Sequence, residues 1–276
     1  MRNTINEFDI ANFAAPMKYS FVAVMNDEGY PHMNLITSLE GRGEKEIVFA
    51  RNYAGETKNL LEEKKDAGFM SLGLDMNFWS GKMRLREIEN EGELMAYYNS
   101  KPSSRYNTYF TCLSVYLNDL IGIEGPTPIN VAAIGSYVQQ VLPQMPTLVS
   151  GGEDGPITSN MIDIITRQTT AKFICWQGED GIPEFAPLFG AIPAGSARMA
   201  FALEESADRL AGIPDGAKVT LHMIDAMTVH AIQVRGEYHQ TPDGLGYIDV
   251  KQVYNPMAPR PSIVYPRVPY AAVTEF

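Results

Sequence analysis

Cysteine is scarce in this sequence, with only Cys112 and Cys175 among 276 residues. Two isolated thiols can build neither a disulfide framework nor a structural zinc site, which both need several cysteines at short spacings. Cys175 lies in the apolar run Phe173–Trp176, a setting typical of a buried small side chain. The cysteine content therefore favours a reducing compartment, and we expect the cytoplasm.

Positive charge is also in short supply. Lys and Arg number 22 against 33 Asp and Glu, which gives a formal net charge of −11. Such a balance argues against nucleic acid or an anionic membrane surface as a partner. An anionic small molecule would have to be captured by a local basic pocket.

Long apolar runs and metal-ligand patterns are missing as well. Residues 1–7 lack the apolar core of a signal peptide, and no later segment approaches the length of a membrane span. The four histidines, His32, His222, His230 and His239, show no metal-ligand spacing, so we expect no metal site. His32 lies in an expected strand, where a surface position is favoured over a ligand contact.

The most informative stretch that is present runs from Ile47 to Leu61. Its β-branched and aromatic start predicts a buried strand, Asn52–Gly55 predicts a tight turn, and the residues from Glu56 onward predict a helix. The turn would deliver Arg51, Thr57 and Lys58 to a helix N-terminus. A hydroxyl, two cations and the helix dipole together favour a phosphate site, although a solvated turn with scattered charges fits this stretch equally well.

Several elements around this stretch follow one another in a familiar order: Phe21–Met25, Asp27–Gly29, Pro31–Leu39, Phe49, Asn52 and Thr57–Lys58. Together they resemble the flavin-binding half of the pyridoxamine 5'-phosphate oxidase-like split β-barrel family. In that family a strand, an Asp/Gly turn and a Pro-led strand precede a third strand that ends in a phenylalanine, an asparagine turn and a Ser/Thr–Lys pair.

The resemblance implies that the chain binds FMN. Its phosphate would be held by Arg51, Thr57 and Lys58, next to Asn52, and its ring would lie along the backbone of Asn34, Leu35, Ile36 and Thr37. Arg84 would be either part of a solvated strand face or a cation facing the flavin pyrimidine. Asn34 and Leu39 stand where authentic pyridoxamine phosphate oxidases carry Arg and Lys, so the fold and cofactor carry over better than the namesake reaction.

The pattern then repeats. At a shift of 152 positions Phe21, Gly29 and Pro31 meet Phe173, Gly181 and Pro183, without a gap through Phe49 and Phe201. Gly92–Glu93, expected to lie in a strand, would pair with Gly236–Glu237. We therefore predict a mainly β protein with accessory helices, in which two tandem split β-barrels form an intrachain pseudo-dimer. Its expected parts are residues 1–125, a helix-containing linker 126–156, and residues 157–276.

The second copy lacks the phosphate-binding residues, because Arg51, Thr57 and Lys58 fall opposite Leu203, Arg209 and Leu210. Family members usually work as homodimers, so the second half would serve as a built-in partner closing over one flavin. We expect either a monomeric pseudo-dimer or a homodimer.

The expected function is that of an FMN-binding flavoprotein, an oxidoreductase acting on a small-molecule substrate or an electron-transfer partner. No catalytic residue can be assigned from the sequence. The alternatives are a non-catalytic FMN or electron carrier and a cofactor-free or haem-binding split-barrel module. The aromatic stretch Tyr97–Phe110 would be an interface surface or an insertion that covers a core.

Overall fold

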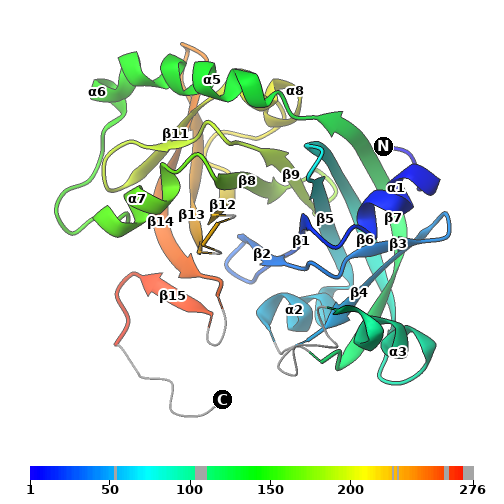
Figure 1. The fold of residues 1–276 in the computed structure, drawn as a ribbon. Coiled ribbons are helices and arrows are strands. Elements are labelled where there is room, and N and C mark those ends of the chain that lie inside the picture. Colours follow the sequence, from blue (N-terminus) through cyan, green and yellow to red (C-terminus); the bar gives the residue numbers. More distant parts are fainter. Residues whose placement is uncertain (53–54, 103–110, 226, 229, 258–260, 270–276) are drawn as a thin grey trace. The chain divides into compact units, whose positions relative to one another are not determined.

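A computed structural model describes residues 1–276 except 53–54, 103–110, 226, 229, 258–260 and 270–276 (Figure 1). The chain forms two compact units. Unit 1 comprises Met1–Asp27, His32–Ile129 and Gly178–Glu184, and unit 2 comprises Glu28–Pro31, Asn130–Gln177 and Phe185–Phe276. Within the described residues, no helix has the length and apolarity that crossing a membrane requires.

The sheet of unit 1 contains seven strands in the spatial order β2-β1-β5-β6-β7-β4-β3. They are β1 (Lys18–Met25), β2 (Pro31–Leu35), β3 (Glu40–Arg42), β4 (Glu46–Arg51), β5 (Asp66–Gly73), β6 (Asn77–Glu89) and β7 (Ser114–Pro128). The accompanying helices are α1 (Glu7–Phe13), α2 (Glu56–Lys64) and α3 (Glu93–Ser100).

The sheet of unit 2 follows the path β10-β11-β14-β13-β12-β8-β9, with a further strand paired to β14. The strands are β8 (Thr170–Gln177), β9 (Pro183–Pro187), β10 (Ile192–Pro193), β11 (Arg198–Ala202), β12 (Lys218–Asp225), β13 (Ala231–Gln240), β14 (Leu245–Asn255) and β15 (Ser262–Tyr265). The α-helices are α5 (Ile134–Val141), α6 (Met145–Leu148), α7 (Ser159–Ile165) and α8 (Ala207–Leu210). Short 3₁₀ turns occupy η2 (Val131–Ala133), η3 (Leu142–Gln144) and η4 (Leu203–Ser206).

The two sheets have the same topology. Read from the β9 end, the second path repeats the first strand for strand, with β8 to β14 in the places of β1 to β7. Strand register agrees with this equivalence, because Ala23 pairs with Gly68 and Cys175 pairs with Thr220, both shifted by 152 positions. The predicted mainly β fold with a tandem duplication is therefore confirmed.

The repeats differ in the connection between their last two long strands. The pair Lys82–Gly122 corresponds to the pair Arg235–Gln252, at shifts of 153 and 130 positions. Between these paired positions the first repeat therefore carries 23 more residues than the second. Helix α3 begins this insertion.

The strand expected at Gly92–Glu93 is wrong. Gly92, with a φ of +112°, precedes the first turn of α3, whereas Gly236–Glu237 lies within β13. The apolar alternation that predicted a strand ends with β6, and a glycine in the left-handed region is the kind of residue that redirects a chain. The predicted equivalence of Gly92–Glu93 with Gly236–Glu237 is therefore wrong as well.

Part of the aromatic stretch covers a core. Tyr98 of α3 is buried against Val48 and Ala50 of β4, together with Cys112 and Val115. The opposite face of β4 packs into the main core of unit 1 through Ile47 and Phe49, so this strand is covered on both faces. This explains its unbroken apolar sequence. Residues 103–110 of the stretch lie outside the described residues.

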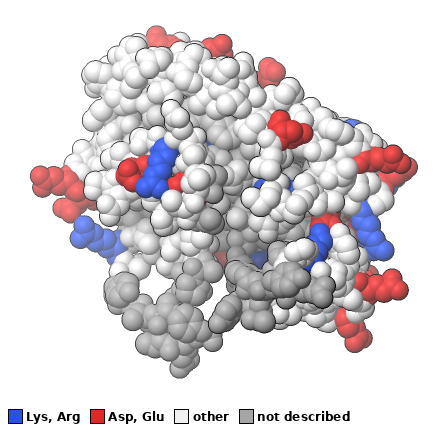
Figure 2. Space-filling view, in the orientation of Figure 1, with Lys and Arg blue, Asp and Glu red and all other residues white. Residues whose placement is uncertain are grey.

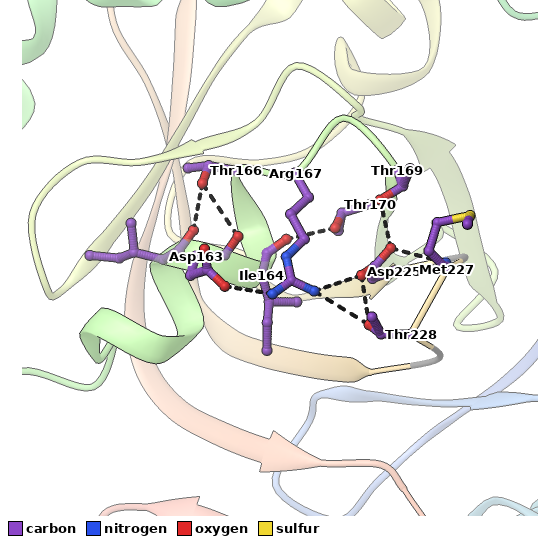
Figure 3. Close-up of polar contacts among 10 residues, drawn as sticks. Asp163, Ile164, Thr166, Arg167, Thr169, Thr170, Asp225, Met227 and Thr228 are labelled. Atoms are coloured by element: carbon purple, nitrogen blue, oxygen red, sulfur yellow. Dashed lines mark hydrogen bonds and ion pairs between the residues drawn. The ribbon is translucent and has the colours of Figure 1, made fainter.

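A buried carboxylate joins the end of α7 to the end of β12 in unit 2 (Figure 3). Asp225, 1% exposed, accepts hydrogen bonds from the hydroxyls of Thr169 and Thr228 at 2.6 Å each and from Arg167 at 2.9 Å. These bonds, led by that of Thr169, hold the pKa of Asp225 well below its usual range. Arg167 in turn reaches Asp163 of α7.

Replacing Asp225 with Asn should lower the Tm by about 5 °C at pH 7, because an amide lacks the charge and half the acceptor capacity that these donors use. A carboxylate whose pKa is lower in the folded than in the unfolded protein stabilises the fold fully above its unfolded pKa. That stabilisation is lost as the pH falls through its folded pKa. The Tm difference between wild type and variant should therefore shrink in acid. The control is Asp163→Asn, because the carboxylate of Asp163 also contacts Arg167 but is exposed to solvent. Equal Tm losses for the two variants would contradict the prediction.

Candidate functional site

The junction between β4 and α2 brings three of the predicted side chains together. Ile47 and Phe49 point into the core of unit 1, and Arg51 follows on the same face as the last residue of β4. Helix α2 then starts after Gly55, which provides no side-chain cap, so Thr57 and Lys58 lie in an uncapped first turn. The turn predicted between them includes residues 53 and 54, which lie outside the described residues.

Two of these side chains are buried at the helix N-terminus, and the third, Arg51, is half-buried. Thr57 and Lys58 are each 2% exposed. Burial, and next the charge of Arg51, lower the pKa of Lys58 to about 8. Within the described part of the chain, Thr57 Oγ1 and Arg51 Nε are buried without a hydrogen-bond partner. Buried polar groups are normally satisfied, so this combination is suited to an anionic ligand. We call Arg51, Thr57 and Lys58 the cradle.

Ser114 lies next to the cradle, and the sequence did not suggest it. It opens β7 and stands directly opposite Arg51 in the strand register, so both side chains lie on the same face of the sheet. Ser114 is 2% exposed, and its hydroxyl also has no partner among the described residues. Only the pairing of β4 with β7, which are far apart in the chain, reveals this position.

Two carboxylates border the cradle. Arg51 lies 3.7 Å from Glu62 of α2, which also accepts a hydrogen bond from the hydroxyl of Tyr116. His32 Nδ1 lies 3.4 Å from a carboxylate oxygen of Glu56, the first residue of α2. His32 is 3% exposed, so its expected surface position is wrong: the first turn of α2 packs beside it.

The segment expected to carry the flavin ring ends an edge strand and continues into a loop. Asn34 and Leu35 are half-buried at the end of β2, while the side chain of Ile36 enters the core and its N–H donates to Ser20. Thr37 is exposed, and its carbonyl accepts a hydrogen bond from Lys18.

The loop is fixed to the strand that carries Arg51. The hydroxyl of Ser38 accepts a hydrogen bond from the N–H of Ala50 at 3.0 Å. The backbone N–H groups of Thr37 and Ser38 themselves make no hydrogen bond to the described residues. They are therefore available to acceptors on a ligand held near Arg51.

The remaining predicted residues lie apart or at the rim. Arg84 is 61% exposed and pairs with Asp66 through bonds of 2.6 and 2.9 Å. Asp66 starts β5 just after α2 ends, so Arg84 lies near the opposite end of the helix from Thr57. Asn52 directly follows β4, next to Arg51. The structure thus gathers the cradle and the loop after β2, and it leaves Arg84 on the solvated strand face.

The corresponding place in unit 2 is built differently. Leu203 begins the 3₁₀ turn η4, and Arg209 and Leu210 belong to the four-residue helix α8. Leu210, the residue equivalent to Lys58 at the shift of 152 positions, is 1% exposed in the core of unit 2. At this position unit 2 therefore has an apolar side chain where unit 1 has a buried ammonium group.

Neither the charges on the drawn face nor the metal-ligating side chains of the described residues suggest a competing site. On the face drawn in Figure 2, acidic and basic side chains are scattered rather than gathered into one patch. Among the residues that the structure describes, no three His, Cys, Asp or Glu side chains are placed to hold a metal ion.

No protein-family model and no curated protein sequence matches this chain. Solved structures do. An FMN-binding protein from Syntrophomonas wolfei is 18% identical, with a TM-score of 0.37 over 42% of this chain and 82% of its own. A pyridoxamine 5'-phosphate oxidase-like protein from Lactobacillus delbrueckii is 10% identical, with a TM-score of 0.36 over 45% and 95%.

A third similar structure is the flavin reductase of styrene monooxygenase from Pseudomonas putida. It is 9% identical, with a TM-score of 0.29 over 45% of this chain and 89% of its own. Each of these matches spans less than half of the chain. In structure the chain is thus similar, over one part of its length, to FMN-binding split-barrel proteins.

Proposed function

We propose that unit 1 binds FMN and that its cradle holds the 5'-phosphate. The observation that carries this proposal is the burial of Arg51 Nε and Thr57 Oγ1 without partners among the described residues, beside the buried ammonium of Lys58. A phosphate dianion offers three oxygens that accept such donors, and its charge suits a helix N-terminus. Ser114 adds a fourth donor from β7.

The loop after β2 would orient the ring. The N–H groups of Thr37 and Ser38 suit the carbonyl oxygens of a flavin pyrimidine, and the hydrogen bonds of Ser38 to Ala50 keep the loop beside β4. Bound FMN supplies hydride and single-electron chemistry, so the protein would act as an oxidoreductase on a small molecule or exchange electrons with a partner. The residues described here bind and position the cofactor.

The test is the flavin content and selectivity of the purified protein. We expect a yellow protein that releases FMN rather than FAD, and that binds added FMN more tightly than riboflavin because riboflavin leaves the cradle unsatisfied. Flavin fluorescence titrations at fixed ionic strength measure both affinities. A colourless preparation that does not bind added FMN at micromolar concentration would contradict the proposal and favour a cofactor-free module.

A further inference from the structure

In unit 2 a side-chain carboxylate is bound by the backbone of a loop. The loop follows β9, and the N–H of Gly190 donates to the two carboxylate oxygens of Glu205 at 2.9 and 3.2 Å. Glu205 belongs to η4, and a hydrogen bond from Ser206 to the carbonyl of Pro187 ties η4 to the end of β9, where the loop starts. The contact therefore joins two elements that are separate in the chain.

The surroundings of this carboxylate are those of a binding site for an acceptor. Lys172 of β8, 5% exposed, donates to the carbonyl of Phe189 at 2.7 Å and attracts Glu205 electrostatically. Burial raises the pKa of Glu205 to about 7, although the N–H groups of Gly190 and Phe189 favour the ionised form. The half-buried carboxyl group of Glu205 thus has donors of the loop and the ammonium group of Lys172 around it.

The loop backbone and the carboxylate approach each other closely at Gly190. A Cβ on Gly190 would come within 2.9 Å of the Glu205 carboxylate and 3.0 Å of Tyr137 in α5. A larger residue at this position would therefore displace the carboxylate end of Glu205 and crowd Tyr137. The backbone of the loop thus leaves room for a carboxylate directly against Gly190.

The first repeat contains an equivalent loop, but its sequence offers no equivalent carboxylate. In unit 1 the N–H of Ile36 donates to Ser20 and that of Leu39 donates to Ile36, and in unit 2 Leu188 donates to Lys172 and Ala191 to Leu188. The N–H groups of Phe189 and Gly190 are therefore equivalent to those of Thr37 and Ser38. At the shift of 152 positions, Glu205 falls opposite Tyr53, a residue type without a carboxylate.

We propose that the loop at Phe189–Gly190, with Lys172, is a carboxylate-binding site, and that Glu205 fills it as an internal ligand. A small monocarboxylate takes the same place when Glu205 is truncated. The second repeat is then closed to outside ligands by its own side chain and not only by the loss of the cradle residues. This proposal does not depend on flavin binding.

The experiment uses the full-length Glu205→Ala variant, with sodium acetate as the probe and sodium chloride at equal ionic strength as the reference. We expect the variant to melt below the wild type and acetate to raise its Tm by about 2–4 °C in a saturable manner. Glu204→Ala removes the neighbouring carboxylate, which contacts Gln140, and should show neither effect. Glu205→Gln keeps an acceptor oxygen and should melt near the wild type without a response to acetate.

An acetate response of Glu205→Ala no greater than that of the wild type and Glu204→Ala would overturn the proposal. If Glu205→Ala does not stay folded, the yield of folded protein after dilution from urea into acetate or chloride gives the same comparison. Equal yields would be the negative result. Because each arm measures stability without flavin, the outcome is separate from that of the FMN titrations.

Discussion

Replacing Lys58 with Ala should weaken FMN binding by roughly ten- to a hundredfold, while riboflavin binding changes little. The ammonium is buried beside Arg51 at the start of α2, so its hydrogen bond to a phosphate oxygen would be charge-assisted and worth about 1.5–3 kcal/mol. Riboflavin lacks the phosphate and never uses this contact. Paired titrations of the two flavins measure the difference directly.

Two variants control for a general loss of charge. Lys64→Ala removes a cation from the other end of α2, where it contacts Asp27, and Arg209→Ala removes the arginine at the equivalent place in unit 2. Both should keep nearly wild-type affinity for FMN. The wild type should also lose affinity as the pH rises past about 8, because Lys58 then gives up its proton, and Lys58→Ala should lack this step. An Arg209→Ala loss as large as that of Lys58→Ala would refute the single-cradle model.

The Asp9→Asn variant should lose about 3 kcal/mol of unfolding free energy, equivalent to a Tm lower by roughly 6–12 °C. Asp9 of α1 is fully buried and accepts two hydrogen bonds from Arg2, at 2.6 and 2.8 Å, and one from the indole of Trp79 at 2.9 Å. An amide leaves the guanidinium without its counter-charge and places a donor against other donors. Thermal or urea unfolding measures the loss.

The same carboxylate should give this loss a pH dependence. Burial raises the pKa of Asp9, but the bonds from Arg2, Asn6 and Trp79 outweigh burial and hold the pKa below its ordinary value. The stabilisation is therefore complete above the unfolded pKa of about 4 and disappears as the pH falls through the folded value. Glu7→Gln, an exposed change on the same helix, serves as the control. A loss that Glu7→Gln matches, or that persists unchanged in acid, would contradict this account.

The sequence could predict the parts of the site that are local in the chain. Arg51, Thr57 and Lys58 lie within one strand–turn–helix segment, so the periodicity and the turn residues bring them together without further information. The duplication was visible for the same reason, because a constant shift of 152 positions needs no knowledge of the fold. Both features depend only on the order and spacing of residues in the chain.

Features that depend on strands meeting across long separations could not be predicted. Ser114 comes next to the cradle only through its register with Arg51, and His32 meets Glu56 only once α2 has packed beside β2. Glu205 contacts Gly190 through a bend that brings η4 back to the loop after β9. A single sequence shows that Ser114, His32 and Glu205 are polar, but it does not show their partners.

The unequal connections between the last long strands also bear on how much the chain can be altered. Over residues 80–85 of β6 and 233–238 of β13 the two strand pairs keep matching registers, each with an irregularity at the equivalent place, between Lys82 and Met83 and between Arg235 and Gly236. They do so although the first repeat has 23 more residues between the pair Lys82–Gly122 than the second has between Arg235–Gln252. The register of these strand pairs therefore depends on the strands and not on the length of the connection. The short turn around Gly244 is thus a site where a peptide tag or a small domain could be inserted with the sheet intact.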